Sequence, residues 1–90
     1  MKVEFDPAKD RANRDKHGLS LSEGEAVFAD PDHFVSPSVR IDDREERSKV
    51  IGMVRGRLHT AVFTRRGDAI RFISVRKSNG SETRVYTSRS

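Results

Sequence analysis

The sequence predicts an α+β fold in which two N-terminal helices and a short C-terminal helix pack on a small antiparallel sheet. Residues 50–77 are rich in β-branched and aromatic side chains and contain two glycine-bearing breaks, a pattern typical of strands joined by tight turns. Helix start and stop signals lie upstream, within residues 6–31. Because a chain of 90 residues supports one hydrophobic core, we expect a single domain over residues 1–90.

The N-terminal segment predicts a short strand followed by a polar helix. Residues 2–5 alternate charged and apolar side chains, as in a strand with one buried face. Asp6 can cap a helix that starts at Pro7, and Gly18 can end it. The helix offers only two side chains for burial, Ala8 and Ala12.

One face of this helix is a candidate ligand-binding surface. Four polar residues share it at positions i, i+4, i+7 and i+8, namely Lys9, Asn13, Lys16 and His17. Amide, ammonium and imidazole groups in register suit a ligand site. The same spacing fits a solvated helix whose His17 interacts with the helix dipole, so spacing alone leaves both interpretations open.

A second helix is expected to cover one face of the sheet. Ser20 and Glu23 have the spacing of a capping box, and residues 30–31 end the segment. Leu21 and Phe28 lie seven residues apart on this helix. We expect both side chains to point inward.

Turn residues and apolar patterning define the remaining elements. Residues 33–39 should form an edge strand, because Pro37 cannot donate a ladder hydrogen bond, and residues 40–47 a charged loop. The expected strands of the meander are residues 50–54, 57–64 and 69–77. Residues 78–86 predict a weak terminal helix, because several of them are poor helix formers.

The middle strand of the meander carries apolar side chains on both of its faces. Leu58 and Val62 share one face, and Ala61 and Phe63 share the other. We therefore expect both faces of the sheet to be covered.

Composition excludes several classes of protein. The chain contains no cysteine, which excludes a disulfide framework and a thiolate metal site. No apolar run approaches the roughly 18 residues of a membrane span, and the N-terminus lacks a signal-peptide core. We expect a soluble, cytoplasmic protein.

Charge is distributed unevenly between the two halves of the chain. Residues 1–45 hold seven Lys or Arg and eleven Asp or Glu, a net charge of −4, whereas residues 46–90 hold eleven and three, a net charge of +8. A basic surface of this kind attracts phosphate backbones, so nucleic acid is the expected partner. The alternative is a basic surface that is simply solvated.

The available side chains suit RNA cleavage without a metal or cofactor. The three histidines, His17, His33 and His59, are far apart, and no HExxH, P-loop, GxGxxG or GxSxG motif is present. Asp42 and Asp43 could bind a divalent ion weakly, although an acidic loop is the better explanation for them. Histidine with surplus arginine fits a reaction in which a base activates the 2′-hydroxyl and cations neutralise the phosphorane.

Several separated motifs occur in an order that is specific when they are taken together. They are Phe5-Asp6, Lys9, Asn13, Lys16-His17-Gly18, Ala26-Val27-Phe28, Asp30-Pro31, Asp43-Arg44-Glu45-Glu46-Arg47, Ile51-Gly52, Val62-Phe63-Thr64-Arg65-Arg66, Ile70 to Lys77, and Glu82 to Tyr86. Over nearly the whole chain they resemble the BrnT toxins of type II toxin-antitoxin systems. The resemblance implies a RelE-like ribonuclease fold and inhibition by a BrnA antitoxin.

The resemblance makes two groups of residues candidates for the site. The expected catalytic residues are His17, Arg66, Arg76 and Lys77, and the expected substrate-binding residues are Lys9, Asn13, Lys16 and Arg71. We expect Arg66, Arg76 and Lys77 to converge on a single phosphate. Basic strand ends that face solvent are the alternative explanation for these cations.

The expected partners are RNA and an antitoxin with a ribbon-helix-helix domain. The toxin and antitoxin should form a hetero-oligomer that binds operator DNA through the antitoxin. Two other functions remain open. The chain could bind nucleic acid without cutting it, or it could be an inactive toxin that serves as the corepressor partner of the antitoxin.

Overall fold

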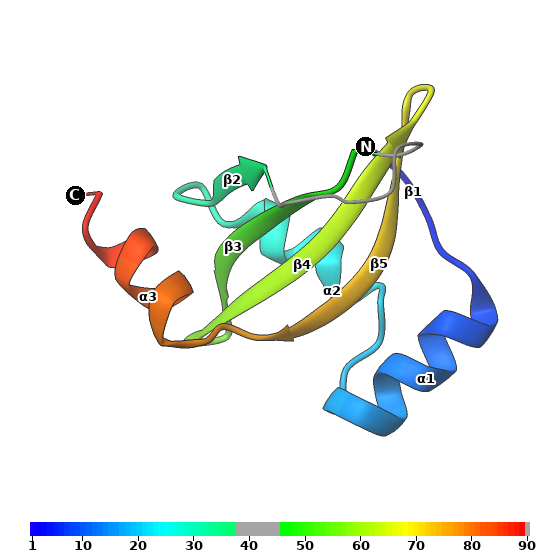
Figure 1. The fold of residues 1–90 in the computed structure, drawn as a ribbon, viewed down its shortest axis with the longest axis horizontal. Coiled ribbons are helices and arrows are strands. Elements are labelled where there is room, and N and C mark those ends of the chain that lie inside the picture. The colour runs from blue at the N-terminus through cyan, green and yellow to red at the C-terminus, as the bar shows by residue number, and fades with distance from the viewer. Residues whose placement is uncertain (38–45, 90) are drawn as a thin grey trace.

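The computed structural model describes residues 1–37 and 46–89 and confirms the predicted α+β class (Figure 1). Within these residues, three helices accompany a five-stranded, mostly antiparallel sheet. The elements are β1 (Lys2–Glu4), α1 (Pro7–His17), α2 (Glu23–Ala29), β2 (Phe34–Pro37), β3 (Ser48–Val54), β4 (Arg57–Arg66), β5 (Ala69–Lys77) and α3 (Gly80–Thr87). Most of the expected charged loop, including Asp42 and Asp43, lies outside the described residues.

The sheet has the strand order β1-β5-β4-β3-β2. The predicted meander is confirmed, since β3, β4 and β5 pair antiparallel in sequence order, and β2 is an edge strand as expected. Glycines at positive φ form its turns, Gly56 at 82° and Gly67 at 60°. The sequence did not reveal that β1 pairs parallel with β5, which brings Val3 beside Ile70.

Helix α2 covers the face of the sheet on which the main core lies. Leu21, Val27 and Phe63 are fully buried there, and half-buried Phe28 packs edge-to-face on Phe63 at 5.1 Å. The predicted inward orientation of Leu21 and Phe28 is therefore confirmed. The helix lies so close that a Cβ on Gly52 would be 2.4 Å from the carbonyl oxygen of Val27.

Helix α1 docks through polar side chains, which corrects the expectation that its alanines are buried. Ala8 and Ala12 are exposed, whereas Asp10 and Asn13 are buried. The Asn13 amide donates to the carbonyl of Val75 at 2.8 Å and accepts from its N–H at 3.2 Å. Asn13 thus forms the hydrogen bonds that a neighbouring strand would otherwise make with the edge of β5.

Two helix starts differ from the prediction. The expected capping box at Ser20 is wrong, because Ser22 is the N-cap and its side chain makes no cap hydrogen bond. Ser20 instead donates to Asp10 at 3.1 Å. A capping box forms at α3, where Asn79 and Glu82 bond each other's backbone N–H groups.

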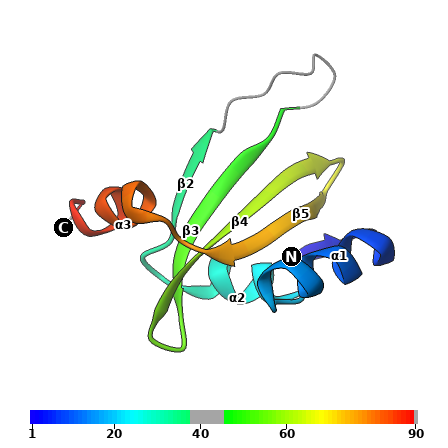
Figure 2. The ribbon, with the colours of Figure 1, turned by 60° about the horizontal axis from the view of Figure 1, so that its bottom comes forward.

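The second face of the sheet is only partly covered. The register places Leu58 and Val62 on the face opposite Ala61 and Phe63, as predicted, but both side chains are half-buried rather than buried. Helix α3 approaches this face near β3, and Figure 2 shows it lying beyond the β2 side of the sheet while α2 lies beneath. The expectation that both faces are covered therefore holds in full for one face only.

Candidate functional site

The candidate site lies where the end of α1 meets the end of β5. Gly18, at a φ of 72°, ends α1 directly after His17. The Asn13 contact with Val75 fixes α1 against β5 one turn earlier. The end of α1 therefore lies against the end of β5, and the positive charge of Arg76 acts on the His17 imidazole.

The electrostatic surroundings of His17 favour its neutral form. Its side chain is half-buried, and desolvation lowers its pKa below the usual 6.5. The positive charges of Lys16 and Arg76 lower the pKa further. At neutral pH the imidazole is therefore mainly unprotonated and able to accept a proton.

Glu82 holds Arg76 in place through a buried network. The guanidinium of Arg76 donates two hydrogen bonds to the Glu82 carboxylate, at 2.8 and 2.9 Å. Glu82 is only 2% exposed and also accepts from Lys49 Nζ at 2.9 Å, Thr60 Oγ1 at 3.0 Å and the Asn79 N–H at 2.9 Å. These donors converge from three strands and the start of α3.

The network keeps Glu82 ionised. Burial alone would raise the pKa of Glu82, but hydrogen bonds from Arg76, Asn79, Lys49 and Thr60 hold it far below 4.5. The same carboxylate raises the pKa of Arg76. A guanidinium has five N–H donors, so the two bonds to Glu82 orient Arg76 and leave donors for an anion.

Sequence patterns alone did not identify Lys49, Thr60 or Glu82 as members of this network. One signal was present, because Asn79 and Glu82 have capping-box spacing. The convergence of Lys49 and Thr60 on that carboxylate depends on strand register and had no local signal.

The other predicted cations lie apart from His17 and Arg76. Arg66 is at the β4–β5 turn, paired with Ala69, about 23 Å from Arg76 along β5. Arg66 and Arg76 therefore cannot share a phosphate while Arg76 stays paired with Glu82, which corrects the expected convergence. Lys77 is exposed, and it follows Arg76 on the strand so that its Cβ points to the opposite face.

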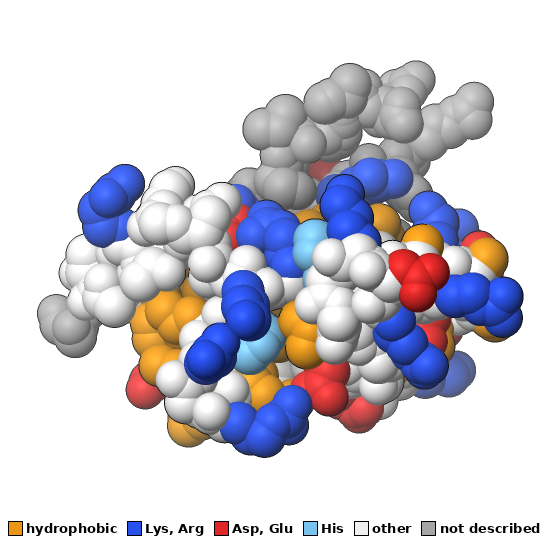
Figure 3. Space-filling model, turned by 90° about the horizontal axis from the view of Figure 1, so that it is seen from below, with side chains coloured by type: hydrophobic (Ala, Val, Ile, Leu, Met, Phe, Trp, Pro, Cys, Tyr) orange, Lys and Arg blue, Asp and Glu red, His pale blue; other side chains and the backbone are white. Residues whose placement is uncertain are grey.

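The remaining predicted binding residues have different surroundings. Arg71 forms an ion pair with Glu4 at 3.0 Å. Lys9 and Lys16 are exposed on α1, whereas the Asn13 amide is only 6% exposed and bonded to backbone. Figure 3 shows Lys and Arg side chains gathered around two histidines on the lower end of the molecule. In the view of Figure 1, α1 and the end of β5 lie at this lower end of the molecule.

The other two histidines have structural neighbours. His33 packs against Phe28 at 5.4 Å between ring centres, and its Nδ1 bonds the Asp30 carbonyl. His59 is buried, with Nδ1 2.9 Å from the Arg57 carbonyl. Among the described residues, no three His, Asp or Glu side chains cluster as metal ligands, and no helix has the length and apolar character to cross a membrane.

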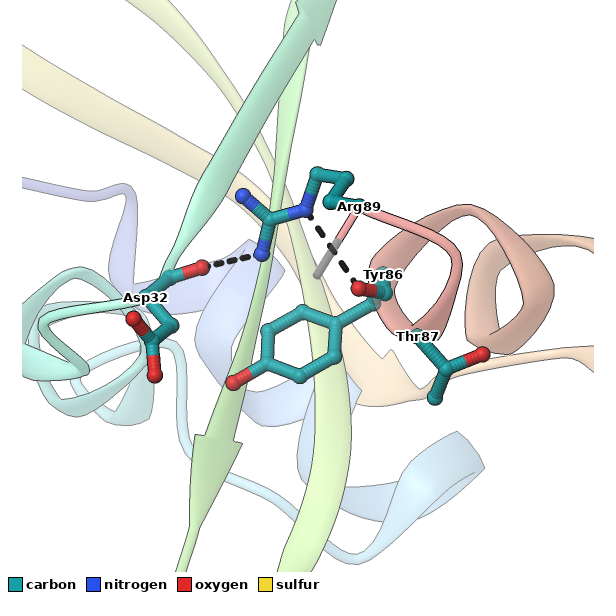
Figure 4. A pocket seen from close by; sticks show the side chains of 4 residues that line it. All are labelled: Asp32, Tyr86, Thr87 and Arg89. Carbon is teal, nitrogen blue, oxygen red and sulfur yellow. Dashed lines mark hydrogen bonds between the residues drawn. The ribbon is translucent and has the colours of Figure 1, made fainter.

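A cavity of about 370 Å³ lies at the C-terminal end of α3 and is lined by Asp32, Tyr86, Thr87 and Arg89 (Figure 4). Arg89 stacks over the ring of Tyr86 at 4.9 Å and bonds the Asp32 carbonyl. The Tyr86 hydroxyl donates to Asp30 at 2.6 Å, which raises the pKa of Tyr86 to about 12. These contacts fasten α3 to the α2–β2 connection.

Comparison with known protein families identifies the family of the chain. No curated protein matches the chain. The family model for BrnT, described as a ribonuclease toxin of type II toxin-antitoxin systems, matches residues 5–82 of the 90. This range includes α1, the whole sheet except β1, and the Arg76–Glu82 network. The chain therefore belongs to the BrnT family of ribonuclease toxins of type II toxin-antitoxin systems.

Proposed function

We propose that the chain is a metal-independent endoribonuclease in which His17 transfers protons and Arg76 stabilises the transition state. The observation that carries this proposal is the guanidinium of Arg76, which Glu82 holds in position at the end of β5 against which α1 docks. Lys16 and Lys77, the chain neighbours of His17 and Arg76, are exposed and add positive charge. Cleavage of RNA in the cytoplasm would arrest growth.

The chemistry needs no group beyond these side chains. Neutral His17 removes the proton of the ribose 2′-hydroxyl, and the oxygen attacks the adjacent phosphorus. The donors of Arg76 that do not bond Glu82 stabilise the charge that develops on the phosphorane oxygens. The bond to the 5′ oxygen then breaks, the proton that His17 took from the 2′-hydroxyl passes to that oxygen, and a 2′,3′-cyclic phosphate remains.

The test is cleavage of RNA by purified protein in EDTA. We expect cleavage without added metal and a loss of about 10²- to 10⁴-fold in His17→Ala. Arg11→Ala, which removes an exposed cation of α1 outside the Lys9–His17 face, is the matched control. A requirement for divalent metal, or a fully active His17→Ala protein, would overturn the mechanism, and folded protein that binds RNA but never cuts it would favour the non-catalytic alternative.

A type II system implies a protein antitoxin, and we propose a BrnA-type partner that covers the basic end of the toxin. A partner that blocks RNA there should present acidic or apolar groups. Its ribbon-helix-helix domain would stay free, so that the complex and not the toxin alone binds operator DNA. The antitoxin should displace saturating RNA, whereas a stable ternary complex of both proteins with intact RNA would contradict a shared surface.

A further inference from the structure

We propose that a cavity at the start of α3 binds one unpaired nucleobase next to the phosphate that is cut, so that the substrate is single-stranded RNA. The inference rests on the proposed ribonuclease function and adds a subsite to it. The cavity measures about 330 Å³ and lies between the tip of the β3–β4 hairpin and the β5–α3 junction. This volume is at the small end of the range for ligand sites.

The apolar part of the cavity suits the flat face of a base. Met53 and Leu58 line it, and they are direct cross-strand neighbours. Met53 is 41% exposed, which is unusual for a large apolar side chain, and Leu58 is half-buried. A thioether makes favourable contacts with aromatic rings, and every base presents such a ring face.

The polar part of the cavity suits the edge of a base. Ser78 and Thr83, which both carry hydroxyl groups, are among its lining residues. Thr83 donates its proton to the Asn79 carbonyl at 2.9 Å, so the lone pairs of its oxygen are available as acceptors. Arg57 and Lys77 also contribute to the wall, which places positive charge where the flanking phosphates would lie.

The cavity is connected to Arg76 through the Glu82 network. Ser78 Oγ lies 2.8 Å from Thr60 Oγ1, and Thr60 donates to the carboxylate that binds Arg76. Ser78 follows Arg76 by two residues, about 7 Å along an extended chain. A base in the cavity would thus belong to a nucleotide next to the phosphate held by Arg76. A base that is stacked and paired in a duplex cannot enter such a cavity.

The test compares Met53→Ala with Val85→Ala. The two side chains are exposed to 41% and 42%, but only Met53 lines the cavity. The probe is a short single-stranded RNA with one 2′-deoxy nucleotide at its mapped cut site, which binds but cannot be cleaved. We expect Met53→Ala to weaken binding by up to about tenfold, as loss of one strong thioether–ring contact does, and Val85→Ala to leave it unchanged.

An abasic nucleotide identifies the group that the cavity binds. Removing the base beside the cut should weaken binding by the wild-type protein about tenfold, and Met53→Ala should then cause no further loss. Duplex RNA should resist cleavage. Equal binding by both variants, additive losses for Met53→Ala and the abasic probe, or equal cleavage of duplex RNA would each overturn the inference.

Failure of the subsite and failure of the ribonuclease proposal give different results. If His17→Ala abolishes cleavage while Met53→Ala behaves like Val85→Ala, only the nucleobase site is wrong. If wild-type protein never cuts RNA, the ribonuclease proposal fails whatever the binding results. A Met53→Ala protein that binds RNA normally but no longer binds antitoxin would show that the cavity is a protein-docking site.

Discussion

Replacing Glu82 with glutamine should destabilise the protein and change how its stability depends on pH. Glutamine keeps the shape of the side chain but removes the negative charge that Arg76 and Lys49 share, and it turns an NH₂ group toward donors. Breaking a buried ion pair costs about 3–5 kcal/mol. We expect a loss near 3 kcal/mol, because the side chains of Arg76 and Lys49 are each 29% exposed and can regain water.

This loss is large for a domain of this size. About 0.05–0.15 kcal/mol per residue gives a 90-residue chain a free energy of unfolding of roughly 5–13 kcal/mol. A loss near 3 kcal/mol should lower Tm by about 12–24 °C. Glu25→Gln, which changes an exposed carboxylate on α2, is the control and should change the stability by less than about 0.5 kcal/mol.

The pH dependence of the stability distinguishes loss of the Glu82 charge from loss of packing. The folded-state pKa of Glu82 lies far below its unfolded value of 4.5, so its contribution is present above pH 4.5 and is lost as pH falls toward the folded pKa. We expect urea unfolding from pH 7 to pH 3 to show that the difference in free energy of unfolding between wild type and Glu82→Gln decreases below pH 4.5. The decrease should be up to about 1.4 kcal/mol per pH unit. Equal stability at pH 7, or a gap that does not change with pH, would refute the reasoning.

Three further predictions concern other parts of the structure. Gly52→Ala should lower the free energy of unfolding in urea by about 2 kcal/mol, because the new Cβ meets the Val27 carbonyl at 2.4 Å. Gly80→Ala, which adds a Cβ in open space, is the control and should change this free energy by no more than about 1 kcal/mol. Tyr86 is the sole tyrosine, so absorbance should report its ionisation near pH 12 rather than pH 10. The stability that it contributes below pH 10 should be lost as pH rises toward 12, and Tyr86→Phe should lower the free energy of unfolding by about 1 kcal/mol. An ionisation midpoint near pH 10 in the folded protein would disprove the Asp30 bond. NMR titration should give His17 a pKa below 6.5, and this pKa should rise in Lys16→Ala and not in Lys9→Ala. The stability that neutral His17 contributes should be lost as pH falls below 6.5. A His17 pKa above 6.5 would contradict its role as the proposed base.

The sheet was predictable because its strands are encoded locally. Alternating apolar residues and glycine turns place β3, β4 and β5, and the two faces of β4 follow from the period of two. The docking of α1 was not predictable. Asp10 and Asn13 are polar, and their burial depends on hydrogen bonds to the backbone of Leu21 and of Val75.

The candidate site was predictable in part. His17 and Arg76 were named from helix spacing and family resemblance, and the Asn13–Val75 contact docks the helix of one on the strand of the other. The expectation that Arg66 joins them failed because the length of β5 separates its two ends. Glu82, the residue that fixes Arg76, was not assigned a role because its partners come from strands that only the folded register aligns.

The contact between Asn13 and Val75 spans 62 residues of sequence, so it affects when the candidate site of a newly synthesised chain can assemble. Helix α1 has eleven residues, mostly polar, and a helix of this length is marginal alone in water. It gains its docking edge only after β5 has been synthesised, and Arg76 gains its carboxylate partner only after Glu82 follows. Contacts of this range form late and slowly, since a long loop must close first. A ribosome making this toxin therefore carries no assembled cluster of His17 and Arg76 until almost all of the matched region, residues 5–82, has left it.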